Sequence, residues 1–177
     1  LTTYAKANVL AEKETLPLSD KSFTVTALRQ ATVYGYSPRM RFDLAINGMV
    51  LGFLKNGKIP IMKDGEQWRP FVHVKDTSNA FVKVLESDPE LVNGQVFNVS
   101  NNEQNLQILN LAKLVAEAIN VPFSFEWYGT PDKRSYKVSF DKIQETLNYK
   151  TSYTPKQGAK EVYDALRQGK LNPDDPR

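Results

Sequence analysis

Cysteine is absent from this chain, and histidine occurs only once, at His73. Without thiols the chain has no disulfide, no thiolate metal site and no cysteine nucleophile. A single histidine excludes a metal centre that is built from several imidazoles. We therefore expect no metal site. His73 lies in a short apolar segment, which favours a hydrogen-bonded core residue over a catalytic base.

Long apolar runs and segregated charge are also missing. No stretch reaches the ~20 apolar residues that a membrane-spanning helix needs, and no signal peptide is recognisable. The 23 basic and 20 acidic residues are well interspersed and leave a net charge of +3, without a basic stripe. We expect a cytoplasmic protein with neither a membrane nor a nucleic acid as its partner.

Nucleotide-binding and nucleophile motifs are missing as well. The sequence has no Gly-x-Gly-x-x-Gly, no P-loop and no nucleophile elbow. Its 177 residues suit one domain or a large part of one. The chain starts at Leu1 without methionine and enters a helical pattern over residues 1–16 at once. We expect an N-terminal part to be absent.

The stretch from Ser22 to Leu54 organises the chain. Residues 22–29 are rich in β-branched and aromatic side chains, which predicts a strand buried on both faces. A polar loop follows at residues 30–41. Apolar residues then recur at helical spacing from Phe42 to Phe53, which predicts an amphipathic helix. Ligands of open α/β sheets lie beyond the carboxyl ends of the strands, and the loop occupies that place.

The remaining pattern alternates strands with helices, so the predicted class is α/β. Pro60 argues that the strand at 59–62 lies at a sheet edge. Asp76 begins a helix whose inner stripe we expect to contain Ala80, Phe81, Val84 and Leu85. Further segments follow in chain order. Strands are expected at 68–74, 95–100 and 123–128, and helices at 108–119, 141–147 and 155–166.

Four stretches resemble the extended short-chain dehydrogenases/reductases, and within them the NAD-dependent nucleotide-sugar epimerases and dehydratases. Tyr4–Lys13 resembles the Tyr-x-x-x-Lys helix, and Leu28–Gly35 resembles the strand and loop beside the nicotinamide. Asp64–Asp76 resembles the segment with the phosphate-contacting arginine. Pro131–Ile143 resembles the late sugar-nucleotide loop. The four stretches occur in the family's order over nearly the whole chain.

The resemblance implies a specific part of such an enzyme. The chain would be the C-terminal substrate-binding part of a Rossmann-type protein whose N-terminal dinucleotide-binding part is absent. Residues 1–35 would be a remnant of the Rossmann domain, and residues 36–177 the substrate-binding α/β region. NAD or NADP would be bound mainly by the missing half. The full-length protein is expected to be a homodimer.

By resemblance, Tyr4 is the catalytic acid/base that exchanges a proton with the sugar during hydride transfer. A free phenol has a pKa near ~10, which the family lowers with a lysine one helical turn later. That lysine also binds the nicotinamide ribose, but this chain has Asn8 there. Lys6 cannot replace it, because residues two apart do not share a helix face. Asn8 puts full turnover in question, and a surface tyrosine without a catalytic role is the alternative.

Other roles are carried over in the same way. Gln30 and Ala31 would lie against the nicotinamide, and Thr32 near both the cofactor and the substrate phosphates. Asp43 and Leu44, at the start of the second predicted helix, would contact the base. The alternative is a strand-end turn whose polar groups satisfy the backbone, with an ordinary helix start at Asp43.

Arg69 is the residue that the resemblance assigns to the substrate diphosphate, because a guanidinium can hold two phosphate oxygens at once. Its alternative is a surface arginine stacked on Trp68. Lys133 and Arg134 would give a second cationic contact, and Asp132 would reach a ribose or base. A solvated charged loop is the alternative for these three residues.

The predicted function is an NAD-dependent epimerase or dehydratase that acts on a nucleotide-diphosphate sugar by transient hydride transfer. The alternative is a non-catalytic protein that binds a nucleotide or nucleotide-sugar and has lost the active-site lysine at Asn8. A nucleic-acid-binding domain is a weaker third reading, because the charges are mixed.

Overall fold

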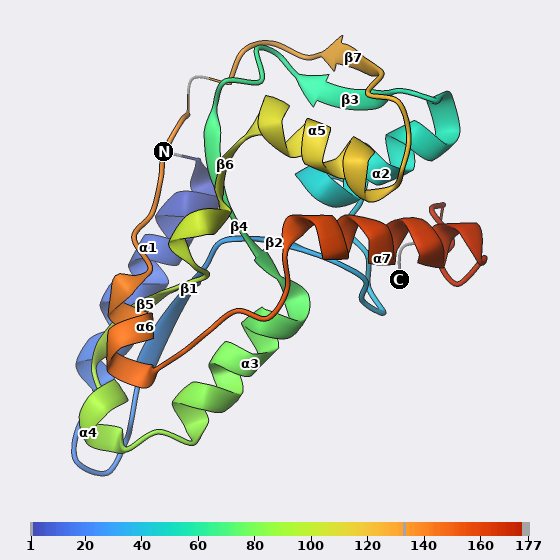
Figure 1. Ribbon diagram of the computed structural model, residues 1–177. Helices are drawn as coiled ribbons and strands as arrows, with labels where there is room; N and C mark the ends of the chain where they lie inside the picture. The colour runs from blue at the N-terminus through green and yellow to red at the C-terminus, as the bar shows by residue number, and fades with distance from the viewer. Residues whose placement is uncertain (1, 133, 175–177) are drawn as a thin grey trace.

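The computed structural model of this chain describes residues 2–132 and 134–174 and has the predicted α/β architecture. Helices and strands alternate along it (Figure 1). The helices are α1 (Thr3–Thr15), α2 (Ala45–Asn56), α3 (Val74–Leu85), α4 (Pro89–Val92), α5 (Ile108–Ala118), α6 (Asp141–Leu147) and α7 (Pro155–Arg167). The strands are β1 (Thr26–Gln30), β2 (Thr32–Tyr34), β3 (Ile59–Met62), β4 (Trp68–His73), β5 (Gln95–Val99), β6 (Asn105–Gln107) and β7 (Phe125–Tyr128). Leu16–Leu18 and Asn102–Gln104 form 3-10 turns.

The strands pair mostly in parallel, between segments that are far apart in the sequence. β1 pairs with β5, β2 with β4, and β3 with β7, while β6 runs antiparallel to β4. Only Ala31 separates β1 from β2. At this residue the chain changes its partner, from Val99 opposite Gln30 to Phe71 opposite Thr32.

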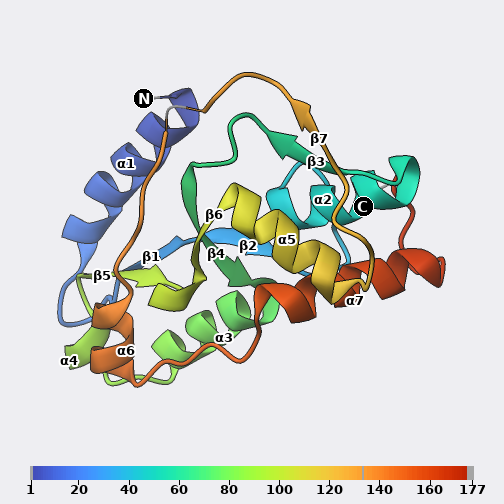
Figure 2. The ribbon, with the colours of Figure 1, turned by 45° about the horizontal axis from the view of Figure 1, so that its top comes forward.

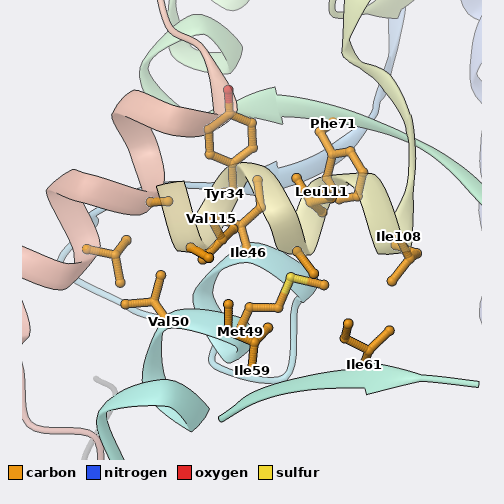
Figure 3. Packing of buried hydrophobic residues seen from close by; sticks show 14 of the residues in the cluster. Tyr34, Ile46, Met49, Val50, Ile59, Ile61, Phe71, Ile108, Leu111 and Val115 are labelled. Carbon is orange, nitrogen blue, oxygen red and sulfur yellow. The ribbon is translucent and has the colours of Figure 1, made fainter. Parts of the chain in front are cut away.

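One hydrophobic core lies among α2, α5, α7 and the strands β2, β3 and β4. Figure 3 shows Tyr34 and Phe71 on one side of it and Met49, Ile59 and Ile61 on the other. The side chains of Leu111 and Val115 are fully buried there. A second core, with Phe97 and Phe140, lies among α3, α6 and β5. The first core thus holds α2, α5 and α7 together, and the second holds α3, α6 and β5 together.

The helix α1 lies apart from the first core, on the opposite side of the molecule from α7 (Figures 1 and 2). None of its residues is buried. Its start and end differ slightly from the predicted 1–16, because Thr2 has an extended backbone and caps the helix, and a 3-10 turn follows Thr15.

The prediction for the first strand was partly wrong. Its residues 22–25 lie outside β1, because the Asp20 carboxylate accepts hydrogen bonds from the backbone N–H groups of Ser22 and Phe23 and folds this segment into a turn. The strand is also not buried on both faces, since Arg29 and Gln30 are exposed. Beyond Ala31, the predicted loop contains the short strand β2, which pairs with β4.

The inner face of α3 also differs from the prediction. Phe81 and Leu85 are exposed, whereas Asp76, Thr77 and Ala80 are buried. Asp76 faces inward because its carboxylate accepts the backbone N–H groups of Ser152 and Tyr153, at 2.8 and 3.1 Å. A polar anchor therefore sets the orientation of this helix.

Other helix and strand predictions are confirmed. The stripe of apolar residues at helical spacing on α5 is buried, namely Ile108, Leu111, Ala112, Val115 and Ala116. β3 pairs only with β7 among the described strands, as Pro60 indicated. His73 is fully buried and hydrogen-bonded. The domain boundary at residue 35 stays a prediction.

Candidate functional site

A cavity of about 1000 Å³ opens where β1 ends and β2 begins. Its walls come from α1, the β1–β2 strand, the loop at 35–44 and the segment at 136–140. It gathers five of the predicted site residues, from α1, the β1–β2 segment and the residue before α2. These are Tyr4, Gln30, Ala31, Thr32 and Leu44.

A second cavity of about 700 Å³ lies beside it, between the start of α2, β3, β4 and the loop at 128–134. Thr32 and Leu44 line both cavities, so the two share a wall. The second cavity gathers the remaining predicted substrate contacts in the described part of the chain. These are Asp43, Arg69, Asp132 and Arg134. Lys133 lies outside the described residues.

Tyr4 stands in the first turn of α1, which Thr2 caps by accepting a hydrogen bond from the N–H of Ala5. Its side chain is 77% exposed and reaches the rim of the first cavity. Asn8, one turn later, is exposed and does not line either cavity. The structure therefore brings Tyr4, but not Asn8, to the residues at the end of β1.

An ion pair connects α1 to β1. The Arg29 guanidinium donates from Nε and Nη2 to the Glu12 carboxylate at 2.7 and 2.6 Å. This hydrogen-bonded pairing lowers the pKa of Glu12 and raises the pKa of Arg29. Both side chains are partly open to water, so the pair contributes little to stability.

The loop that follows β2 is held by Asn47 of α2. The Asn47 side chain accepts from the N–H of Gly35 and donates to the carbonyl of Arg41, at 3.2 and 3.1 Å. Gly35 has a φ of +104°, and a Cβ there would lie 2.3 Å from Nε2 of His73, so only glycine fits. The loop is thus fixed at both ends.

Asp43 and Leu44 do not open α2, which begins at Ala45. They lie in the preceding turn, where the Asp43 carboxylate pairs with the Arg41 guanidinium at 2.7 and 2.5 Å. Hydrogen bonds from Arg41 lower the pKa of Asp43. Leu44 is the N-cap residue of α2 and has no side chain that could accept a hydrogen bond from the first turn.

Arg69 projects from β4 and is nearly covered, with a side chain that is 15% exposed. Its Nη2 donates to Oδ2 of Asp132 at 2.7 Å, and its Nη1 donates to the carbonyls of Trp68 and Arg134. Its guanidinium lies 5.1 Å from the ring centre of Tyr136. The alternative of a surface arginine stacked on Trp68 is wrong, since Lys137 covers that ring instead.

Asp132 is the anionic centre of this cluster. It accepts from Arg69 and also from Arg134, whose Nε and Nη2 each lie 2.8 Å from a carboxylate oxygen. The hydrogen bonds from Arg134, assisted by the charge of Arg69, lower the pKa of Asp132 to about 2. Arg134 itself remains open to water, with a side chain that is 71% exposed.

Behind the first cavity lies a polar network that the sequence interpretation missed. The Glu161 carboxylate of α7 contacts Nε2 of His73 at 2.9 Å and accepts from Nζ of Lys75 at 2.7 Å. It also accepts the backbone N–H of Tyr36. Burial alone would raise the pKa of Glu161, but these hydrogen bonds lower it overall. Spacing in the sequence gives no signal for a contact between residues 88 positions apart.

The lining of the cavities contains further residues without an assigned role. Arg39, Arg41, Asn98 and Tyr136 line the first cavity, and Tyr128 lines the second. Within residues 2–132 and 134–174, no group of three or more metal-ligating side chains could hold a metal ion. None of the described helices combines the length and apolar character needed to cross a bilayer.

The chain is similar to known proteins. Residues 1–100, more than half of the chain, match the model of the NAD dependent epimerase/dehydratase family. A UDP-D-apiose/UDP-D-xylose synthase 2 from Arabidopsis thaliana is 29% identical over 143 residues, which cover 65% of this chain and 36% of that protein. The uncharacterized UDP-glucose epimerase YtcB of Bacillus subtilis (strain 168) is 28% identical over 138 residues, covering 76% of this chain and 42% of that protein. The chain thus spans less than half the length of these relatives.

Solved structures share the fold. The dTDP-glucose 4,6-dehydratase from Bacillus anthracis, solved in complex with NAD, superposes with a TM-score of 0.80 at 20% identity. The match covers 96% of this chain and 53% of that one. MoeE5, solved with UDP-glucuronic acid and NAD, also gives a TM-score of 0.80 at 22% identity, covering 96% and 56%.

Proposed function

This chain belongs to the NAD dependent epimerase/dehydratase family, and on that premise we propose that the protein acts on a nucleotide-diphosphate sugar. The proposed reaction is an epimerisation or dehydration that proceeds through transient hydride transfer, with Tyr4 as the acid/base. One observation carries the proposal. The cavity with Tyr4 and the cavity with Arg69 and Arg134 share a wall at Thr32 and Leu44.

The shared wall suits a ligand with two chemically different ends. A sugar at the first cavity would lie within reach of the exposed Tyr4 hydroxyl. A diphosphate attached to that sugar would enter the second cavity, where two guanidinium groups meet. Guanidinium groups recognise phosphate oxygens strongly because they donate several hydrogen bonds in one plane.

The residues at the end of β1 suit a nicotinamide dinucleotide, NAD or NADP. Gln30 offers an exposed amide for hydrogen bonding, and the small side chain of Ala31 leaves space for a flat ring. Such a cofactor would supply a hydride acceptor and donor. We propose that residues outside this sequence hold its phosphates, because the chain carries no glycine-rich phosphate loop.

Tyr4 would take and return the proton of a sugar hydroxyl. A phenol suits that role when a cation favours its ionised form, and Asn8 brings no charge to the position where the resemblance places a lysine. This supports a slow acid/base step in the protein as it stands.

Asn8 also supports a second candidate function. The protein would then bind a nucleotide-sugar without converting it, because the pocket is kept and the cationic partner of Tyr4 is not. Both candidates use the same two cavities, so they differ in turnover and not in the ligand class.

The deciding experiment incubates the protein with NAD or NADP and a panel of UDP-, dTDP- and GDP-sugars, and detects products by mass spectrometry. We expect turnover that Tyr4→Phe reduces at least a hundredfold, in line with the ~10²–10⁴-fold value of a positioned acid/base. Tyr163→Phe is the matched control, since its hydroxyl has only a 3.5 Å contact with Arg167.

Asn8→Lys separates the two candidates. If it raises turnover at least tenfold at unchanged ligand affinity, the native protein is a weakened enzyme. If neither form converts any sugar while both bind one, the binding function holds. The enzymatic proposal fails if Tyr4→Phe and Tyr163→Phe behave alike.

A further inference from the structure

We propose that Asp132 is an internal competitor of the ligand's diphosphate, whose carboxylate must leave Arg69 and Arg134 before phosphate oxygens can take its place. The proposal rests on the function proposed above in taking a diphosphate as the ligand. It adds that Asp132 lowers the affinity of this site for the diphosphate.

The carboxylate of Asp132 is saturated by its two cationic neighbours. Oδ2 accepts from Nη2 of Arg69 at 2.7 Å and from Nη2 of Arg134 at 2.8 Å. Oδ1 accepts from Nε and from the backbone N–H of Arg134, at 2.8 and 3.0 Å. This is the arrangement in which guanidinium groups also hold phosphate oxygens.

Both terminal nitrogens of Arg69 already have hydrogen-bond partners. Its Nη1 is engaged by the carbonyls of Trp68 and Arg134, and its Nη2 donates to Asp132. The Arg69 side chain lines the second cavity but is only 15% exposed, because these partners cover most of it. The Asp132 side chain is itself only 12% exposed, whereas Arg134 is 71% exposed, so an approaching diphosphate meets Arg134 first and competes there with the Asp132 carboxylate.

The loop does not need the carboxylate in order to stay in place. The backbone N–H of Asp132 donates to the carbonyl of Lys63, and that of Tyr136 donates to the carbonyl of Trp68, both at 3.3 Å. The hydroxyl of Ser135 accepts from the N–H of Trp68 at 3.0 Å. The Asp132 side chain can therefore rotate away while the loop remains attached to β4.

Charge favours the exchange only for a strongly anionic ligand. Arg69 and Arg134 together carry two positive charges, and Asp132 neutralises one of them. A diphosphate brings at least two negative charges, so it can neutralise both guanidinium groups, whereas the single charge of Asp132 neutralises one. This second charge offsets the cost of displacing Asp132.

The test measures binding of inorganic pyrophosphate by isothermal titration, which requires neither the cofactor nor turnover. We expect Asp132→Asn to bind pyrophosphate about tenfold more tightly than the native chain. Glu145→Gln, which removes the same charge on α6 away from both cavities, should leave the affinity unchanged. Adding Arg134→Gln to Asp132→Asn should abolish the gain in affinity, because it removes the guanidinium group that the loss of the Asp132 charge makes available to pyrophosphate.

Unchanged or weaker binding by Asp132→Asn would overturn the proposal, as would a failure of both forms to bind pyrophosphate. Asp132→Ser serves as a second variant if the asparagine form does not fold, which a thermal melt would reveal. Failure of the proposed function looks different. In that case the pyrophosphate gain is present, but no nucleotide-sugar is bound or converted.

Discussion

The helices α1 and α5 are of similar length but relate to the rest of the molecule in opposite ways. α5 buries Leu111 and Val115 completely, in the core that Figure 3 shows. α1 buries no residue and is connected to β1 by the exposed Arg29–Glu12 pair. The proposed acid/base Tyr4 thus lies on the weakly attached helix, and the proposed diphosphate site lies beside the packed one. Stability and chemistry can therefore be perturbed separately in this chain.

The test with the largest expected effect replaces one leucine in each of the two helices. Leu111→Ala should lower the free energy of unfolding by about 2–5 kcal/mol, since it removes a fully buried side chain and leaves a cavity. Leu10→Ala on α1, where the leucine is 56% exposed, should change it by less than ~0.5 kcal/mol. Urea unfolding followed by circular dichroism measures both. Equal losses would show that α1 contributes as much as α5.

A polar anchor gives the next test. Asp76→Asn should cost about 1.5–3 kcal/mol, because the buried carboxylate accepts the N–H groups of Ser152 and Tyr153 and an amide can accept only one of them well. Asp164→Asn on the exposed side of α7 is the control and should be close to neutral. If both variants unfold at the same urea concentration, Asp76 does not anchor α3.

The smallest expected effect, counted for one buried phenol and one pH unit, concerns alkaline pH. Burial raises the pKa of Tyr34 and of Tyr149, with the charge of Asp76 adding to the shift. The folded pKa then lies above the unfolded value near ~10, so this stabilisation is complete below pH ~10 and is lost as the pH rises further. Each buried phenol should cost about 1.4 kcal/mol per pH unit above that point.

Thermal melts between pH 9 and pH 11.5 would measure this loss. Tyr149→Phe should flatten the decline, whereas Tyr4→Phe, at an exposed position, should leave its slope unchanged. A flat profile for the native chain would contradict the role of the buried phenols.

Local patterns in the sequence predicted much of this fold. The apolar spacing at 108–119 identified α5 and its buried face, and Pro155 marked the start of α7, where Thr154 and Gln157 form a capping box. The orientation of α3 could not be predicted in this way. It depends on backbone groups at 152 and 153, which lie far from Asp76 in the sequence.

The candidate site was likewise predicted only in part. The segments that carry Arg69 and Arg134 were recognised by resemblance, and both residues line one cavity. Their shared partner Asp132 was expected to reach a ribose or base, and its pairing with Arg69 joins residues 63 positions apart. The short strand β2 was missed because three residues carry too little pattern, and pairing with β4 makes it a strand.

The pairing of distant strands also dictates an order of assembly during synthesis. Ile59 faces Phe125 and Thr26 faces Gln95, so each early strand leaves the ribosome long before its partner. Until then its edge and its apolar side chains are open to other nascent chains, and contacts of such long range form slowly. We expect refolding from denaturant to be slow and its yield to fall as the protein concentration rises.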